Sequence, residues 1–378
     1  MLSERHALIA LNCVSQVGAA KARSLERAFG SVAAAAEVSA ADIAAQCSEI
    51  NDATALRISM ALNGAVTERE ETRAAGCNVQ ILTWADAAYP DSLRQSPSPP
   101  LALYCAGDIR LLSRTQVAII GTRRASVYGL EQARRFGQRL AAGGIQVTSG
   151  LAEGVDSAAH EGALLAGKEA PAKTIAVIGA ALDCVYPASR KPLARDIARA
   201  GGLVICEYPF GRHADAKTFP QRNRLVAALS KGILVIESPS NSGTMITVNQ
   251  ARGMGGRTLY ALPGRADWPS FAGNHRLIRE GEARLVTMPE HILDDFSVLD
   301  LREGGGVTGE EDGRAEVPPD LTKNELAVCE AAGADGASID AICSRTGLPL
   351  ATVLDLSIAL QMRRRLRPLP GGLMRKNF

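Results

Sequence analysis

Arginine side chains grouped beside a phenylalanine are the residues of this chain best suited to bind a charged ligand. The stretch Thr218–Val226 reads TFPQRNRLV, and Pro220 suits the first turn of a helix, so the basic residues stand at the beginning of that helix. A guanidinium group pairs with phosphate and a neighbouring ring can stack on a base, as sequence-tolerant binding of single strands requires. An internal salt-bridge cluster is the alternative. The candidate DNA-binding residues are Lys217, Phe219, Arg222, Asn223 and Arg224.

Two glycine turns, each between a predicted strand and a predicted helix, offer backbone N–H groups to the same kind of ligand. Residues 116–120 are an apolar run typical of a buried parallel strand, and Gly121 ends it in a tight turn that carries Arg123 and Arg124. Ser126 can cap the helix that follows. Ligands bind at such turns, outside the carboxyl ends of the strands. The predicted contacts are Gly121, Thr122, Arg123 and Ser126 in the first turn and Gly150 in the second.

A further anion site is predicted where a strand at 233–236 leads into another helix. Ser242, Gly243 and Thr244 stand at the beginning of that helix, so their hydroxyl and N–H groups lie at its positive end. Plain N-capping of the helix is the alternative interpretation of the same residues.

Asp156 and His160 are four residues apart on the helix that opens at Gly154, so their side chains can face each other. A structural cap and brace is one interpretation, and a general acid/base pair without an obvious nucleophile nearby is the other. The remaining histidines show no metal-ligand spacing, and no GxGxxG fingerprint follows the strand at 116–120. The sequence therefore predicts no catalytic residue, no metal and no nucleotide cofactor.

Strand-like runs alternate with helical patterns through the middle of the chain. This alternation predicts an α/β fold, a Rossmann-like, doubly wound and mostly parallel sheet. The expected strands are 101–104, 116–120, 145–148, 174–178, 203–206, 233–236, 258–261 and 284–286.

The regions on either side of the predicted sheet differ from it in pattern. Residues 1–95 read as helical, and Val14–Lys21 resembles a helix-hairpin-helix turn, so an N-terminal helical (SAM/helix-hairpin-helix-like) domain is expected. The sheet domain spans 96–302, and 303–320 is an acidic, glycine- and proline-containing linker. Residues 321–378 read as three short helices and a basic hairpin, which predicts a winged-helix-like C-terminal domain. Its third helix carries no basic residue, so reading of DNA by that helix is doubtful.

Composition places the chain among ordinary globular proteins. Of its 378 residues, 42 are Lys or Arg and 40 are Asp or Glu, so a polyanionic partner must meet a local basic patch. The eight cysteines include no CxxC pair, which favours reduced thiols and a cytoplasmic location. No apolar run approaches membrane-spanning length, and no membrane partner is expected.

Taken together, these motifs resemble the DNA-processing protein A family (DprA, also called Smf) of bacterial recombination mediators. The resemblance is close over residues 115–287. It rests on GTRRASVYG at 121–129, SGLAEGVDSAAHEGAL at 149–164, TIAVIGAALDCVYP at 174–187, FPQRNR at 219–224, SGTMIT at 242–247, ALPG at 261–264 and GNHRLIREGE at 273–282. Cys206 and Val248 depart from the residues usual in the family, and neither change removes a charged contact.

The resemblance implies a protein that binds single-stranded DNA without sequence preference, forms a homodimer through the Rossmann-like domain and loads the RecA recombinase during natural transformation. Carried over by motif, Arg123, Arg222 and Arg224 would contact phosphates. The same pocket would be lined by Lys217 and Phe219, with Ser242, Gly243 and Thr244 on the facing loop.

Two other classes of function fit parts of the sequence. The fold also resembles nucleotide 5'-monophosphate phosphoribohydrolases with a PGGxGTxxE signature, but Thr247 stands where their catalytic glutamate is expected. Without that carboxylate, charge developing on the ribose would lack its partner. A pure interaction adaptor, with the sheet as a scaffold, is the third class.

Overall fold

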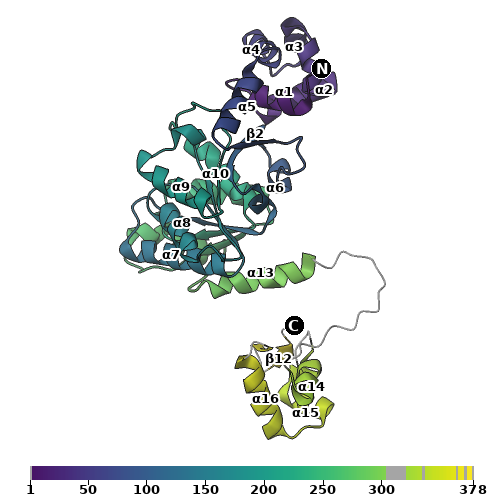
Figure 1. Ribbon diagram of the computed structural model, residues 1–378. Coiled ribbons are helices and arrows are strands. Elements are labelled where there is room, and N and C mark those ends of the chain that lie inside the picture. The colour runs from purple at the N-terminus through teal and green to yellow at the C-terminus, as the bar shows by residue number, and fades with distance from the viewer. Residues whose placement is uncertain (1, 304–320, 334–336, 363–364, 370–372, 377–378) are drawn as a thin grey trace, which may run out of the picture. The chain divides into compact units, whose positions relative to one another are not determined.

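The computed structural model describes residues 2–303, 321–333, 337–362, 365–369 and 373–376. By contacts between Cα atoms the chain forms two compact units, Met1–Gly305 and Gly306–Phe378 (Figure 1). The linker predicted at 303–320 lies outside the described residues from 304 onward, as do Arg363, Arg364 and the hairpin turn at 370–372.

A nine-stranded sheet forms the centre of the first unit, in the order β1-β2-β6-β5-β4-β3-β7-β8-β9. The strands from β6 to β9 in this order are parallel, whereas β2 pairs antiparallel with both β1 and β6. The predicted mostly parallel, doubly wound α/β fold is therefore confirmed. The strands are β1 (Gln80–Thr83), β2 (Ala102–Gly107), β3 (Gln116–Ile120), β4 (Gln146–Ser149), β5 (Thr174–Val177), β6 (Leu203–Cys206), β7 (Gly232–Val235), β8 (Thr258–Ala261) and β9 (Arg284–Leu285).

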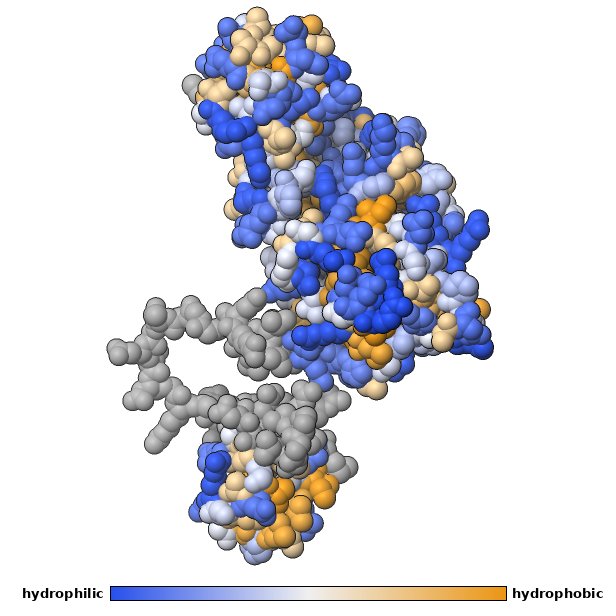
Figure 2. Space-filling model, turned by 180° about the vertical axis from the view of Figure 1, so that it is seen from behind, coloured by the Kyte–Doolittle hydropathy of each residue, from blue (hydrophilic) through white to orange (hydrophobic). Residues whose placement is uncertain are grey.

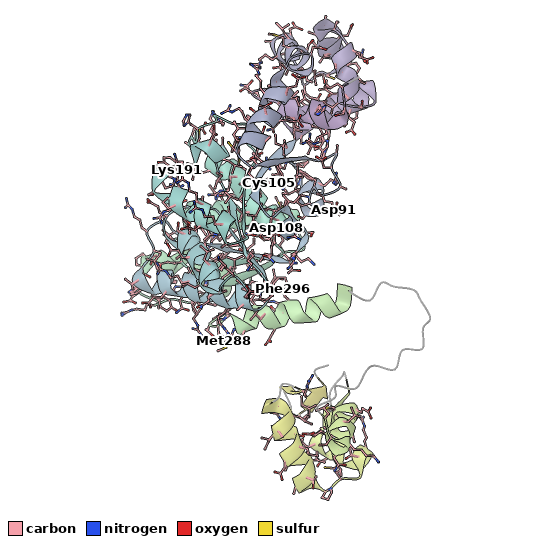
Figure 3. The ribbon with its side chains drawn as sticks, in the orientation of Figure 1. Asp91, Cys105, Asp108, Lys191, Met288 and Phe296 are labelled. Atoms are coloured by element: carbon pink, nitrogen blue, oxygen red, sulfur yellow. The ribbon has the colours of Figure 1, made fainter. Side chains whose placement is uncertain are left out.

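Helices cover both faces of this sheet because its central strands are apolar on both sides. Val117 and Ile119 of β3 pack with α7, α8 and α13, whereas Ala118 and Ile120 pack with α10, α11 and α12. Phe296 of α13 is buried in the first of these layers (Figure 3). The helices are α7 (Val127–Ala142), α8 (Val155–Leu165), α9 (Lys191–Arg199), α10 (Thr218–Leu229), α11 (Gly243–Met254), α12 (Ala272–Arg279) and α13 (Glu290–Glu303).

Strand β1 corrects the expectation that residues 1–95 are helical throughout. Gln80–Thr83 pairs in antiparallel register with β2, with Gln80 opposite Cys105 and Thr83 opposite Ala102. Four residues are too few for a period-2 pattern to stand out in the sequence, so pairing with β2 decides this conformation. The rest of the predicted helical region contains α1 (Glu4–Asn12), α2 (Ala19–Phe29), α3 (Ala40–Gln46), α4 (Asp52–Leu62), α5 (Val66–Gly76) and α6 (Asp91–Arg94).

The N-terminal helices share a core of their own and are fastened to the sheet by polar contacts. Tyr104 of β2 donates a hydrogen bond to Glu70 Oε2 at 2.8 Å, and Asn12 donates to the carbonyl oxygen of Glu207 at 3.0 Å. The helix-hairpin-helix-like segment Val14–Lys21 leads from α1 into α2.

The second unit is a small domain of three helices and three short strands, of which the sequence predicts the three helices and the hairpin but not the strand at Ala337–Ser338. Its elements are α14 (Lys323–Ala332), β10 (Ala337–Ser338), α15 (Ile339–Thr346), α16 (Leu350–Met362), β11 (Leu366–Leu369) and β12 (Leu373–Lys376). Leu350, Leu354 and Ile358 of α16 are large exposed apolar side chains, and Figure 2 shows apolar surface on this unit. An exposed apolar face agrees with the doubt that α16 reads DNA.

None of the helices in the described ranges combines the length and apolarity needed to cross a bilayer. All eight cysteines are free thiols. Within the same residues, no group of three or more His, Cys, Asp and Glu side chains is arranged to hold a metal ion.

Candidate nucleic-acid interface

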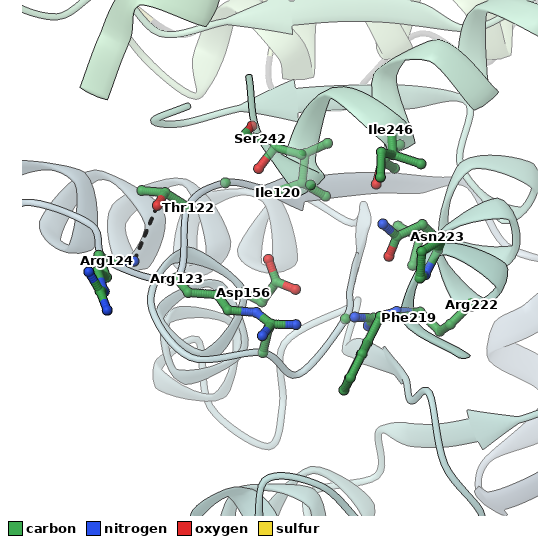
Figure 4. Close-up of a pocket in the computed structure, with 18 residues that line it drawn as sticks. Ile120, Thr122, Arg123, Arg124, Asp156, Phe219, Arg222, Asn223, Ser242 and Ile246 are labelled. Atoms are coloured by element: carbon green, nitrogen blue, oxygen red, sulfur yellow. Dashed lines mark hydrogen bonds between the residues drawn. The ribbon is translucent and has the colours of Figure 1, made fainter. Parts of the chain in front are cut away.

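The candidate binding cavity lies at the point in the sheet where the direction of strand addition reverses. Strands β3 and β7 are neighbours, and the chain builds the sheet outward from them in opposite directions. Ligands of open α/β sheets bind at such a point, outside the carboxyl ends of the strands. A cavity of about 390 Å³ occupies this position (Figure 4). The predicted residues that line it are Gly121, Thr122, Arg123, Gly150, Phe219, Arg222, Asn223, Ser242, Gly243 and Thr244.

The turn after β3 is held in place by Glu237, a buried carboxylate that sequence reasoning missed. The N–H of Thr122 donates to the carbonyl oxygen of Glu237 at 2.8 Å. Ser126 donates to the Glu237 carboxylate through its N–H at 3.0 Å and through its hydroxyl at 2.7 Å. Ser126 also accepts from the N–H of Gly129, so its predicted capping of α7 is confirmed, whereas the side chain is not among those that line the cavity. A glutamate directly after a buried strand is the signal that could have revealed this role.

Arg123 is the exposed cation of this turn that reaches toward the aromatic side of the cavity. Its guanidinium carbon lies 5.0 Å from the centre of the Phe219 ring, in a cation–π contact. Arg124, in contrast, extends away from the centre of the cavity, and its N–H donates to the Thr122 hydroxyl at 3.2 Å (Figure 4). Of the two arginines, Arg123 is thus the one placed to meet a ligand in the cavity.

Arg222 lines the same cavity from α10 but is almost completely buried, with 4% of its surface exposed. Its Nη1 donates to the carbonyl oxygen of Val177 at 2.6 Å. Burial lowers the pKa of Arg222, and the charge of Asp156 acts in the opposite direction. Burial likewise raises the pKa of the Asp156 carboxyl, and the Arg222 guanidinium opposes that rise. The two charges therefore stabilise each other at the floor of the cavity.

Gly150 leaves the space that the Arg222 guanidinium occupies. A Cβ atom added at Gly150 would lie 1.8 Å from Nη1 of Arg222. The glycine predicted to contact the ligand thus also has a packing role, because no other residue type leaves room for the buried cation.

Replacing Gly150 with alanine is expected to lower the free energy of unfolding by about 2 kcal/mol, since overpacking of a filled interior site costs about 1–3 kcal/mol. Urea unfolding followed by tryptophan fluorescence measures this effect, because Trp84 and Trp268 both belong to the first unit. In a protein that also carries Arg222→Met, Gly150→Ala should lower the free energy of unfolding by clearly less. Equal costs in both backgrounds would contradict the steric explanation.

His160 is fully buried beneath the cavity, and its ring bonds to a strand instead of to Asp156. Its Nδ1 lies 2.7 Å from the Thr174 hydroxyl oxygen, and that hydroxyl donates to the carbonyl oxygen of Val147 at 2.7 Å. Nδ1 therefore carries the proton and donates it to Thr174. Burial, with a smaller contribution from the Arg222 charge, lowers the pKa of His160 to about 3. A neutral, enclosed imidazole that does not line the cavity favours the structural interpretation over the acid/base pair.

Arg224 and Lys217 are not among the residues that line the cavity. Arg224 forms an ion pair with Glu207, and both side chains are mostly buried. For Arg224, the structure therefore has the salt-bridge arrangement that the sequence left open as an alternative. Lys217 is exposed, and its N–H donates to Asp215 at 2.8 Å just before α10.

The N-terminus of α11 faces the cavity without a side-chain cap. The hydroxyl of Ser242 lies 2.8 Å from that of Ser238 and does not accept from the helix, so plain N-capping by Ser242 is wrong. Gly243 and Thr244 open the helix, and backbone N–H groups in its first turn carry partial positive charge. This end of α11 is therefore suited to an anionic group.

Both units of the chain are similar to known proteins. Residues 80–297 match the family described as DNA recombination-mediator protein A, and residues 313–372 match the DprA winged helix domain. Protein Smf of Escherichia coli (strain K12) is 33% identical over 292 residues, which cover 76% of this chain and 75% of that protein. The DNA processing protein DprA of Streptococcus pneumoniae (strain ATCC BAA-255 / R6) is 38% identical over 211 residues, which cover 56% of this chain and 72% of that protein.

Solved structures agree with these matches. The X-ray structure of DNA processing protein A from Streptococcus pneumoniae is similar with a TM-score of 0.61 at 29% identity, covering 78% of this chain and 93% of that one. The structure of DNA processing protein A from Helicobacter pylori describes a single-stranded DNA binding mode of that protein. It is similar with a TM-score of 0.52 at 30% identity, covering 59% of this chain and 96% of that one. Because the family match spans more than half of the chain and includes every strand and turn that builds the cavity, the chain belongs to the DNA recombination-mediator protein A family.

Proposed function

We propose that this protein binds single-stranded DNA without sequence preference in the cavity at the carboxyl ends of β3 and β7. The observation that carries the proposal is the placement of an exposed cation on an aromatic ring, Arg123 on Phe219, opposite the uncapped N-terminus of α11. Phosphate contacts position a strand without reading its sequence, and aromatic rings accept the face of any base. The single-stranded DNA binding mode of the Helicobacter pylori relative supports the same ligand class.

The arginines contribute to this site in different ways. Arg123 is exposed and supplies a contact that can form when the strand arrives. Arg222 is fixed beneath the cavity by Val177, so it acts through its charge and by shaping the floor. Arg224, already paired with Glu207, contributes to the fold of α10. The phosphate contacts of the proposal are therefore made by Arg123 and by the backbone at the N-terminus of α11. In the β3 turn the N–H groups of Thr122, Arg124 and Ser126 already donate hydrogen bonds within the protein.

The wider role we propose is loading of the RecA recombinase onto the bound strand by a homodimer, in the cytoplasm, during natural transformation. Membership of a family described as recombination mediators supports this role. The eight free thiols fit a reducing compartment.

Nucleotide hydrolysis is the second candidate, because the cavity also contains a carboxylate. That carboxylate, Asp156, is 8% exposed and faces the buried Arg222, and Thr247 lines the cavity where the hydrolase signature would place a glutamate. A carboxylate engaged in this way is poorly placed to stabilise charge on a ribose. Binding without catalysis is the better account of the cavity.

A salt series with labelled oligo-dT tests the proposal by fluorescence anisotropy. Arg123→Ala is expected to weaken binding about tenfold at low salt, the size of effect typical of one lost charged hydrogen bond. Its slope of log affinity against log salt should be shallower by about 0.7, since one phosphate is no longer neutralised.

Arg110→Ala is the matched control. Arg110 is an exposed arginine between β2 and β3. It lies near the amino end of β3, away from the cavity at the carboxyl end, and pairs with Asp108 at 2.8 Å. Its removal should leave both affinity and slope unchanged. Absence of wild-type binding to oligo-dT at low salt would refute the proposal, and nucleotide monophosphates would then be tested as substrates. Unchanged affinity in Arg123→Ala, as the adaptor class predicts, or equal losses in the two variants would mean that the cavity is not the binding site.

A further inference from the structure

We infer that a second cavity, between α9 and strands β2 and β6, is a docking site for an acidic segment of a partner protein that inserts one apolar side chain. This cavity has a volume of about 280 Å³. It shares no lining residue with the candidate DNA-binding cavity, so docking here is independent of DNA binding.

Helix α9 leaves this cavity open because the residues that it turns toward the sheet are small. Ala194 and Ala198 line the cavity together with Ala106 of β2 and Val204 of β6. Further apolar walls include Leu182 and Phe210. The volume is below the range of about 300–1,000 Å³ of pockets that enclose a whole small molecule, and above the roughly 150 Å³ of an apolar cavity that holds benzene. The space therefore suits one large apolar side chain.

The charge around the cavity is positive. Lys191 and Arg195 lie one turn apart on α9, line the cavity and are exposed (Lys191 is labelled in Figure 3). Neither forms an ion pair within the described part of the chain. Asp183, the carboxylate that lines the cavity, pairs with Arg73 at 2.9 Å and accepts from the N–H of Gly211 at 3.0 Å. The two cations of α9 therefore favour an acidic partner.

A peptide fits this cavity better than a nucleic acid does. Phe210, the aromatic residue that lines it, is 8% exposed. The Arg73 guanidinium carbon lies 5.0 Å from the centre of the Phe210 ring, and the Tyr104 ring lies 5.3 Å away in an edge-on arrangement. A base needs an open ring on which to stack. An inserted apolar side chain needs only the apolar walls that are present.

Fluorescence anisotropy with three labelled peptides of equal length tests the site on the full chain. In the first peptide, acidic residues flank a single phenylalanine. In the second, serine replaces the phenylalanine, and in the third, lysines replace the acidic residues. The wild type is expected to bind the first peptide about tenfold or more tightly than either of the others, since burial of one phenylalanine and one charged hydrogen bond are each worth about this factor.

Two variants separate the charge of the site from its shape. Arg195→Glu is expected to weaken binding of the first peptide about tenfold. Ala198→Leu fills the cavity, keeps both cations and should weaken binding by a similar factor, while the filled cavity leaves the free energy of unfolding no lower. Arg135→Glu is the matched control, because Arg135 is an exposed arginine on α7 that does not line this cavity. It should change the affinity by less than about twofold.

Cys77 reports where the peptide binds. It lines the cavity and is the exposed one of the eight cysteines. A saturating amount of the first peptide should slow alkylation of Cys77 by iodoacetamide, followed by mass spectrometry, whereas oligo-dT should not. Unslowed alkylation, equal binding of the phenylalanine and serine peptides, or equal losses in Arg195→Glu and Arg135→Glu would overturn the docking site. Protection of Cys77 by oligo-dT would also overturn it and would extend the nucleic-acid surface to α9.

Discussion

The variant Arg224→Met is expected to unfold with a free energy about 3 kcal/mol lower than that of the wild type. Arg224 forms an ion pair with Glu207, and both side chains are mostly buried. Burial raises the pKa of Glu207, and the Arg224 charge opposes this rise. Removing one partner of a buried ion pair leaves the other charge uncompensated, which costs about 3–5 kcal/mol. Urea unfolding followed by tryptophan fluorescence provides the measurement.

The double variant Arg224→Met/Glu207→Gln separates the lost charge pair from lost packing. It should recover most of the stability, because a neutral amide no longer requires a cationic partner. Below its unfolding transition, the single variant should bind oligo-dT as the wild type does, since Arg224 is not among the residues that line the cavity. A large loss of affinity in the folded double variant would instead restore Arg224 as a DNA contact.

Acid conditions are expected to destabilise the first unit through His160. Its pKa is about 3 in the folded protein, against about 6.5 in an unfolded chain. Below about pH 6.5 the unfolded chain therefore binds a proton that the folded protein does not, and stability falls by about 1.4 kcal/mol per pH unit. This contribution is complete above about pH 6.5 and is lost progressively toward pH 3. Asp156 acts in the opposite direction, because its raised pKa makes the folded state take up a proton first.

The variant His160→Asn isolates the imidazole from the other titrating groups. Asparagine can donate to the Thr174 hydroxyl in place of Nδ1 but does not titrate. Between about pH 6 and 4.5, the stability of this variant should fall less steeply than that of the wild type, by about 1.4 kcal/mol per unit. Urea unfolding at several pH values compares the two proteins. Parallel curves would show that another group carries the acid sensitivity.

Local pattern was enough to predict the parallel sheet and most of the cavity. Apolar runs followed by glycine turns, as at 116–121, indicate a buried strand and the turn at its carboxyl end, where ligands of such sheets bind. Ser126 caps α7 for the same local reason. Arg123 and the helix start at Ser242–Thr244 were found because they lie directly on these turns.

The partners of individual charges were decided by tertiary structure. Arg222 and Arg224 are two residues apart on α10, and side chains at that spacing do not face the same way on a helix. One points to the cavity floor near Val177 and Gly150, and the other to Glu207 on a different segment. The sequence motif predicts the same role for both arginines, whereas the geometry of the helix gives them different partners.

The same reason explains the residues that sequence reasoning missed. β1 is a strand because β2 pairs with it, and Glu237 holds the β3 turn because that turn packs against it. The sequence by itself determined the parallel strands and the positions of the turns that follow them, since these follow from periodicity and glycine placement. Only the tertiary structure decided which side chains are buried, paired or open to a ligand, because those properties depend on contacts between segments far apart in the chain.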